Sequence, residues 1–439
     1  MSPLGGGAIV LGALAGLVAG AKTLRSRGRL SAEASRKLVH LGMGSICLSF
    51  PWLFGDPWPV WALAGLACAA LGAVRWVPFL RRELGSVLHA VERVSWGELY
   101  FPLSVAAVFT LARHQPILFF VPVALLTYAD AAGALVGRRW GRLHFATLEG
   151  TKTVEGSLAV GATGFLCAAV PLSIGGAPAH TAVLIGALIG LFGLLLEAVS
   201  WRGLDNVFLP LAAFAQISGY PGLPASALAA RLLVLGAITL AALIWRRGHL
   251  VDDSARLGGT LALFFFWAVG GWTWLVAPLV LLTAYVRLLP TVPGGVPRHN
   301  LVAVICVASA GLVWSVANVF APDPRWLWPY TLGIAAQQAV IAIVRFSQGR
   351  PRWPRSAWWA VGITQAAGLH LLAFWLIDRG RTVPVTGYAG GVACVAAAAA
   401  GFVLWEEQLQ LPDDETARWW KQGTVAFAAS AVGFSLMLL

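Results

Sequence analysis

Hydrophobic residues occupy long runs throughout this chain, and short segments rich in glycine, proline or charged residues separate the runs. A helix that crosses the hydrocarbon core of a membrane needs roughly 17 to 25 apolar residues, and most runs approach that length. In the first half, spans are expected near 4–21, 38–54, 59–75, 98–113, 116–137, 157–174, 180–200 and 205–218. In the second half, spans are expected near 226–245, 257–271, 273–287, 300–320, 326–345, 356–377, 384–405 and 422–439. The pattern predicts an all-α fold, a polytopic transmembrane bundle of about 14 to 16 helices, because several runs are short or merge with their neighbours.

The composition agrees with this pattern. Hydrophobic residues make up 58% of the chain and charged residues only 11%, which excludes an ordinary soluble globular protein. The five cysteines stand singly inside apolar runs, without the pairing or spacing of a disulfide or zinc site. We interpret them as small core residues.

Basic residues gather in the loops at one end of the predicted spans. They include Arg25, Arg27, Arg29, Arg36, Lys37, Arg138, Arg139, Arg142, Lys152, Arg202 and the cluster from Arg345 to Arg355. The positive-inside rule assigns these loops to the cytoplasm, and the net charge of +12 also favours contact with anionic membrane lipid. No soluble face combines basic and aromatic residues, so nucleic acid is not an expected partner. We expect a multi-pass protein of a bacterial inner membrane.

A loop rich in proline and glycine, residues 220–226, divides the chain into two predicted domains. Residues 1–222 contain the acidic residues that lie at span edges or in apolar surroundings: Glu98, Asp130, Glu155, Glu197 and Asp205. Acids in such places are costly and are therefore candidates for function. Residues 223–439 carry their acids in loops, so we expect a structural or lipid-binding role there, or a homodimer contact.

Asp130 begins a stripe of glycines at Gly133, Gly137 and Gly141, spaced so that all share one helix face. The glycines alone are typical of close helix packing, and Asp130 alone is compatible with neutralisation by an arginine. Together they favour a site where a bulky anion and its divalent cation approach the backbone.

The segment Lys152, Thr153, Glu155, Gly156 and Ser157 begins the next predicted helix. A lysine, hydroxyl groups, glycine and backbone amides at a helix N-terminus form a suitable cradle for phosphate. Lysine is scarce here, with four copies against 27 arginines, and a lysine in this place suits a point charge against phosphate oxygens. The alternative is the ordinary basic character of a cytoplasmic loop.

Other polar residues flank this core, each with a simpler interpretation beside the functional one. Glu98 is either a ligand or a complement to its helix dipole, and Asp205 with Asn206 is either a ligand pair or a helix cap. Arg36 and Lys37 are expected from topology, and His40 is a weak candidate for a base.

Five ordered motifs carry a family resemblance. They are Arg36-Lys37-x-x-His40, Gly97-Glu98-x-Tyr100-x-Pro102, Asp130-x-x-Gly133-x-x-x-Gly137-x-x-x-Gly141, Lys152-Thr153-x-Glu155-Gly156-Ser157 and Gly203-x-Asp205-Asn206-x-x-x-Pro210. Together they resemble the phytol kinase and dolichol kinase family, which includes CTP-dependent diacylglycerol kinases. The resemblance covers roughly residues 30–215. This chain departs from the family at Gly133, where alanine is common, and at Thr151, where a second lysine is common; its gap between Gly141 and Lys152 is also long.

The resemblance implies a membrane kinase with its active site on the cytoplasmic side. Such an enzyme transfers the terminal phosphoryl group of CTP, or of another nucleoside triphosphate, to the hydroxyl of a long-chain isoprenoid or polyprenol-type lipid alcohol. On this basis Mg²⁺ is expected at Asp130, Glu155 and Asp205, and the catalytic set is Asp130, Lys152, Glu155, Glu98 and His40. The expected nucleotide-binding residues are Gly133, Gly137, Gly141, Lys152, Thr153, Gly156, Ser157, Asn206, Arg36 and Lys37.

Two other functions are alternatives to a lipid kinase. A cytidylyltransferase that forms a CDP-lipid also uses CTP, magnesium and an apolar acceptor. A membrane transporter would place charges near the bilayer midplane and often shows inverted repeats, whereas these acids gather at span ends and the sequence shows no repeat.

Overall fold

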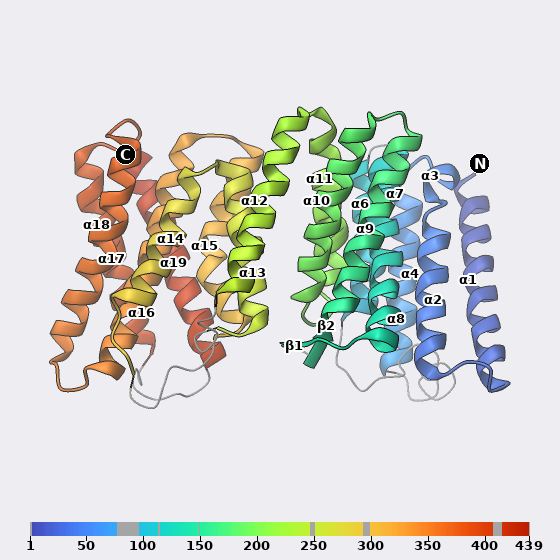
Figure 1. Cartoon of the computed structure of the whole chain (residues 1–439), viewed down its shortest axis with the longest axis horizontal. Helices are drawn as coiled ribbons and strands as arrows, with labels where there is room; N and C mark the ends of the chain where they lie inside the picture. The colour runs from blue at the N-terminus through green and yellow to red at the C-terminus, as the bar shows by residue number, and fades with distance from the viewer. Residues whose placement is uncertain are drawn as a thin grey trace. The chain divides into compact units, whose positions relative to one another are not determined.

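The computed structural model describes residues 2–76, 96–112, 115–148, 150–245, 251–292, 299–406 and 415–438. The chain forms two compact units, Met1–Val234 and Leu235–Leu439, which are described separately (Figure 1). The division falls inside the helix that follows the predicted boundary at residue 222. The roles assigned to the two domains remain predictions.

The described residues of unit 1 form helices and one small hairpin. Its elements are α1 (Pro3–Ser26), α2 (Ala32–Cys47), α3 (Phe50–Leu53), α4 (Pro57–Trp76), α6 (Gly97–Ala112), α7 (Pro116–Ala124), the π-helical turn η1 (Leu125–Ala129), α8 (Asp130–Trp140), β1 (His144–Thr147), β2 (Gly150–Thr153), α9 (Val154–Ile174), α10 (Ala179–Ala198), α11 (Asp205–Gly219) and the 3₁₀ turn η2 (Tyr220–Gly222). The helix α12 (Ala225–Ile244) crosses the division.

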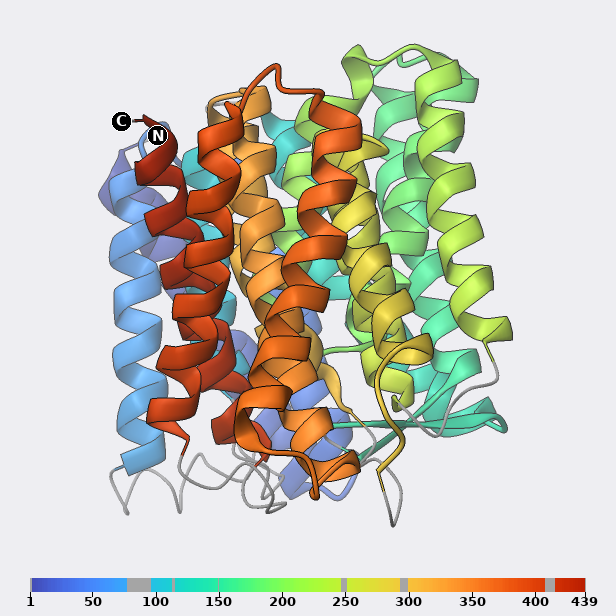
Figure 2. The same cartoon turned by 90° about the vertical axis from the view of Figure 1, so that its left-hand side faces the viewer.

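Unit 2 consists of helices. They are α13 (Asp253–Gly270), α14 (Thr273–Arg287), α15 (Leu301–Phe320), the 3₁₀ turn η3 (Pro324–Trp326), α16 (Leu327–Gly349), α17 (Arg355–Asp378), α18 (Val385–Trp405) and α19 (Glu415–Leu438). Nearly every residue of α16 is buried, because other helices of the unit surround it (Figure 2).

The predicted all-α class is confirmed, and the protein is a multi-pass membrane protein. Ten helices among the described residues are long and apolar enough to cross a membrane. The other six expected spans also fall on helices, namely α2, α6, α11, α13, α14 and α19. These six helices are shorter or carry more polar residues, so they are not among the ten that are long and apolar enough to cross a membrane. The expected total of about 14 to 16 spans is therefore larger than ten.

One long helix of unit 1 changes its winding immediately before Asp130. The segments α7, η1 and α8 form a continuous helix from Pro116 to Trp140, with Pro122 in its interior. Proline lacks an amide hydrogen and disturbs the helical ladder, and η1 follows within the next turn. Such wide turns rotate the residues beyond them and are frequent at functional sites. Here the turn sets the direction in which Asp130 projects.

The hairpin connects α8 to α9. Strands β1 and β2 are antiparallel, with His144 opposite Thr153 and Phe145 opposite Lys152. The hairpin lies at the same end of unit 1 as the turn between α1 and α2 (Figure 1). The α9 helix starts directly after β2, so the strand places its residues beside the first turn of the helix.

Close glycine contacts join α9 to α10. A Cβ atom on Gly190 would lie 2.5 Å from the carbonyl oxygen of Gly161 and 3.1 Å from the amide nitrogen of Phe165. Both obstacles are backbone atoms, which cannot rotate away. The two helices therefore approach at a distance that only glycine allows.

We predict that Gly190→Leu lowers the free energy of unfolding by about 1–3 kcal/mol, the usual cost of overpacking a buried contact. Gly368→Leu is the matched control, since Gly368 lies inside α17 with no neighbouring atom within 4 Å of its added Cβ. Thermal unfolding of both variants in detergent measures the difference. Equal stability of the two variants would contradict the close contact.

Candidate functional site

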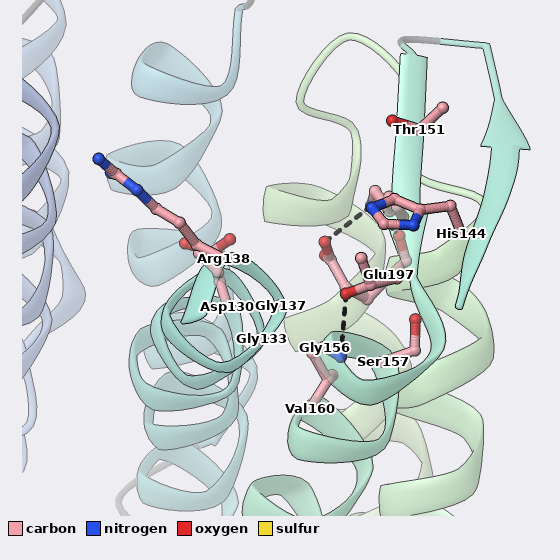
Figure 3. Close-up of a pocket in the computed structure, with 13 residues that line it drawn as sticks. Asp130, Gly133, Gly137, Arg138, His144, Thr151, Gly156, Ser157, Val160 and Glu197 are labelled. Carbon is pink, nitrogen blue, oxygen red and sulfur yellow. Dashed lines mark hydrogen bonds and ion pairs between the residues drawn. The ribbon is translucent and has the colours of Figure 1, made fainter. Parts of the chain in front are cut away.

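A pocket of about 330 Å³ lies at the hairpin end of unit 1. Its lining comes from α8, the hairpin, the start of α9 and the end of α10: Asp130, Gly133, Ala134, Gly137, Arg138, His144, Thr151, Lys152, Thr153, Gly156, Ser157, Val160 and Glu197. Figure 3 shows Gly156 and Ser157 at the start of α9, with Glu197 and His144 beside them. The volume is at the lower end of the roughly 300–1,000 Å³ typical of ligand sites.

Asp130 forms an ion pair across to α2. Its Oδ2 atom accepts a hydrogen bond from Lys37 Nζ at 2.7 Å and lies 3.7 Å from His40 Nε2. His40 Nε2 also lies 3.4 Å from the carbonyl oxygen of Leu126 in η1. Asp130 is thus hydrogen bonded to a lysine, with a histidine one helical turn further along α2. The sequence also allowed an arginine as the partner.

Lys152 occupies the other side of the pocket. Its Nζ atom donates to Glu197 Oε1 at 2.7 Å and to Ser200 Oγ at 2.7 Å, and it also contacts the carbonyl oxygen of Glu197. The side chains of Lys152 and Glu197 are only 25% and 15% exposed. A carbonyl, a carboxylate and a hydroxyl together fix the ammonium group against α10.

Three carboxylates meet in this region. One ligand atom from each of Asp130, Glu197 and Asp205 lies within 4.8 Å of the other two. Glu197 and Asp205 come together because the chain reverses through Arg202 and Gly203, both in the left-handed region with φ of 53° and 79°. Glycine adopts this conformation without strain, and the turn returns the start of α11 to the end of α10.

This cluster suits a divalent cation. Glu197 Oε2 is buried and has no hydrogen-bond partner among the described residues, and a buried carboxylate oxygen without a partner is costly. Lys37 and Lys152 bond to Asp130 and Glu197, and Asp205 brings a third carboxyl group to the same place. Carboxylate oxygens are the ligands that Mg²⁺ prefers, and the residues present therefore fit that ion.

The glycines of the site bring α8 against α9. A Cβ on Gly133 would lie 2.5 Å from Val160 Cγ2, and one on Gly156 would lie 2.9 Å from the carbonyl oxygen of Gly133. Gly137 faces Thr153 Oγ1 at 2.7 Å from its added Cβ. Close packing is thus one role of the stripe. Gly133, Gly137 and Gly156 also line the pocket, so the same contact forms its wall.

The first amides of α9 are already used within the protein. Thr153 caps the helix, with its Oγ1 atom accepting from Gly156 N at 3.2 Å. Val154 N donates to the carbonyl oxygen of Leu143 at 2.9 Å. The expected phosphate cradle of free amides is therefore not present at these two positions, and Lys152 is the principal cation on this side of the pocket.

Several expected site residues lie outside the pocket lining. Glu155 turns toward the hairpin, where its Oε1 and Oε2 accept from Leu143 N at 3.2 and 3.3 Å, so the structure does not bring it to Asp130. Gly141 packs against Thr153, and Asn206 Nδ2 donates to the carbonyl oxygen of Gly203 at 3.2 Å. Arg36 lies near the start of α2, and Glu98 lies in the first turn of α6.

Sequence reasoning did not assign Glu197 and Ser200 to the site. Glu197 was recognised as an acid at a span edge, but nothing in its local pattern paired it with Lys152, which is 45 positions earlier. Gly203 is the sequence feature that could have indicated the role of Glu197. A glycine between two acids allows a tight turn of the chain that brings the two acids together.

The capping interaction at Thr153 is testable through stability. We predict that Thr153→Ala lowers the free energy of unfolding by about 1 kcal/mol, the usual cost of losing an N-cap. Thr153→Ser keeps the hydroxyl that accepts from Gly156 N and should remain close to wild type. Denaturation in detergent would measure both, and a Ser variant as unstable as the Ala variant would disprove the cap.

Comparison with known proteins agrees with this geometry. Over 202 residues the chain is 30% identical to the phytol kinase of Synechocystis sp., and the match covers 45% of this chain and 84% of that relative. No family model matches the chain, and no solved structure matches it. Since the match extends over most of the relative, the chain belongs to the phytol kinase family.

Proposed function

We propose that this protein is a membrane kinase that transfers the terminal phosphoryl group of CTP to the hydroxyl of a long-chain isoprenoid or polyprenol-type lipid alcohol. One observation carries the proposal. A pocket with a buried, unpartnered carboxylate oxygen and a lysine occurs in a chain similar to a phytol kinase. The choice of CTP follows the family resemblance of the motifs.

Magnesium is assigned to Asp130, Glu197 and Asp205. This set differs from the one inferred from sequence, because Glu197 takes the place of Glu155. When bound, the ion offsets the charge of the nucleotide phosphates and of the transferred group. The Lys37 contact holds the Asp130 carboxylate in a fixed direction.

Lys152 is assigned to the outer phosphates. In the present arrangement it pairs with Glu197, and with Glu197 holding a metal ion this pairing would be released. The released ammonium group would then contact phosphate oxygens as a point charge. Phosphoryl transfer depends mainly on such alignment and charge compensation.

His40 and Glu98 remain the two candidates for the base that receives the alcohol proton. A carbonyl oxygen only accepts, so His40 Nε2 carries a proton in its contact with Leu126, and Nδ1 is left to accept. His40 packs edge-on against Phe101 of α6 with ring centroids 5.2 Å apart. Glu98 and Phe101 are three residues apart in that helix, so Glu98 belongs to the face of α6 that meets His40.

The site is assigned to the cytoplasmic side of a bacterial inner membrane. In unit 1 the hairpin lies at the same end as the turn between α1 and α2 (Figure 1), and that turn contains Arg27 and Arg29. The positive-inside rule places such an end in the cytoplasm, where nucleotides are found. The lipid alcohol then enters from the surrounding bilayer.

The ligand set is testable by metal binding. Glu197→Gln is expected to weaken Mn²⁺ affinity, measured by paramagnetic resonance, by about tenfold or more, since a metal ligand loses its charge. Glu155→Gln should retain the affinity because its carboxylate bonds to Leu143 N instead. Loss of affinity in Glu155→Gln with retention in Glu197→Gln would restore the set inferred from sequence.

The reaction is testable with labelled nucleotide. Membranes containing the protein should transfer label from the terminal phosphate of CTP to phytol, geranylgeraniol or polyprenol, giving a lipid monophosphate. Asp130→Asn should reduce the rate by about 10²–10³-fold, as expected when charge stabilisation of the transferred group is lost. Asp56→Asn, at an exposed turn, is the matched control.

The products separate the alternatives. A CDP-lipid with release of labelled pyrophosphate would indicate a cytidylyltransferase, and the absence of both a lipid monophosphate and a CDP-lipid would favour transport. Full activity of Asp130→Asn would remove this carboxylate from the mechanism. Transfer from ATP in preference to CTP would overturn the nucleotide assignment alone.

A further inference from the structure

Unit 2 contains a buried arginine, whereas an arginine that only marks the cytoplasmic side of the membrane would be exposed in a loop. Arg345 belongs to the basic cluster that the sequence assigns to a cytoplasmic loop, yet it lies inside α16 and is only 7% exposed. Its Nε and Nη1 atoms are buried, and no described residue of the chain is hydrogen bonded to them. None of the ion pairs among the described residues of unit 2 includes it.

Neutral polar groups deep in unit 2 are satisfied only in part, since Gln337 Oε1 and both polar side-chain atoms of Gln338 are buried without a partner among the described residues. Gln337 Nε2 donates to the carbonyl oxygen of Cys306 at 2.9 Å, and His370 Nε2 contacts the carbonyl oxygen of Ala277 at 3.2 Å. These bonds join neighbouring helices, as expected of polar residues in a membrane bundle. Arg345 lacks such a partner, and a buried charge without compensation is strongly unfavourable.

Tyr285 and His299 lie beside this arginine. The guanidinium carbon of Arg345 lies 5.3 Å from the ring centroid of Tyr285, and Tyr285 Oη is hydrogen bonded to His299 Nε2 at 2.5 Å. The backbone of His299 is held by Asp252, whose amide donates to its carbonyl oxygen at 2.9 Å. His299 Nδ1 is also buried without a partner.

The cluster of Arg345, Tyr285 and His299 carries a positive charge. Burial, followed by the neighbouring Arg345 charge, lowers the pKa of His299 to about 4. The imidazole is thus neutral near neutral pH, and Arg345 supplies the charge. A guanidinium group pairs best with a carboxylate or a phosphate, through two parallel hydrogen bonds.

The surroundings combine this charge with apolar surface. Trp419 meets the His299 ring edge to face, with centroids 5.1 Å apart. A hydrophobic cluster of Leu289, Ile341, Ala342, Phe346 and Trp358 also packs against Tyr285, Trp359 and Trp419. Arg345 is close to the end of α16 at Gly349, and basic pockets near helix ends are where lipid head groups bind.

We propose that Arg345, His299 and Tyr285 form a binding site for the phosphate group of a lipid. The guanidinium group binds the phosphate oxygens, His299 Nδ1 donates a further hydrogen bond, and the tryptophans contact the apolar chain. The ligand is either a membrane phospholipid or a prenyl monophosphate, which share this chemistry. The site lies wholly within unit 2 and does not depend on the kinase activity proposed for unit 1.

The test uses the full chain in a sugar-based detergent that contains no phosphate, without nucleotide. Binding of phytyl monophosphate, phosphatidylglycerol and inorganic phosphate is measured separately by tryptophan fluorescence. Arg345→Met should weaken binding of the lipid phosphates by tenfold or more. Arg355→Met is the matched control, since Arg355 is exposed at the start of α17, and should bind as wild type does.

A thermal measurement separates binding from folding. Removing an uncompensated buried charge should leave the melting temperature of Arg345→Met equal to or above that of wild type. The lipid phosphate should raise the melting temperature of wild type and Arg355→Met, but not that of Arg345→Met. Arg345→Lys, which keeps the charge but not the planar fork, should bind with intermediate affinity.

Each outcome decides one part of the proposal. Preference for phytyl monophosphate or for phosphatidylglycerol, dependent on Arg345, supports the site and identifies its source of ligand. Inorganic phosphate binding as tightly as the lipids would overturn the assignment of a lipid. Unchanged lipid binding in Arg345→Met would overturn the site itself.

Discussion

The compensation of buried charge governs the candidate site of unit 1. Carboxylates in a membrane-embedded bundle are tolerated only with partners, and here Asp130 faces Lys37 while Glu197 faces Lys152. Each pair joins elements distant in sequence, so the charges also hold the helices in place. Asp205 joins the same cluster, and Glu197 Oε2 has no hydrogen-bond partner in the part of the chain that the structure describes. The proposed metal ion supplies a partner for that oxygen.

The backbone provides the geometry that this compensation requires. The π-helical turn before Asp130 directs the carboxylate toward Lys37, and the left-handed residues Arg202 and Gly203 return Asp205 to Glu197. Gly133 and Gly156 allow α8 to contact the start of α9, where Lys152 emerges from the hairpin. A larger residue at either glycine would separate the wall that carries Asp130 from the one that carries Lys152.

The same principle applies to unit 2 with the opposite sign. Arg345 is buried beside aromatic residues and has no acidic partner among the residues that the structure describes, so its environment favours an anion just as the carboxylate cluster favours a cation. The proposed action on lipid alcohols would take place among amphiphiles with phosphate head groups. The two units would then bind related chemistry at separate sites, which the proposed experiments examine independently.

The sequence by itself determined the helical membrane fold, because the length and spacing of apolar runs depend only on local composition and on the thickness of the bilayer. It also identified Asp130, Lys152 and Asp205 as functional candidates, because polar residues in apolar surroundings stand out locally. Only the tertiary structure decided which acids meet. Glu155 is close to Lys152 in sequence but turns toward Leu143 N, whereas Glu197 approaches Lys152 from a different helix. Partner choice of this kind depends on how helices pack and where turns reverse the chain, and these contacts leave no periodic signal along the sequence.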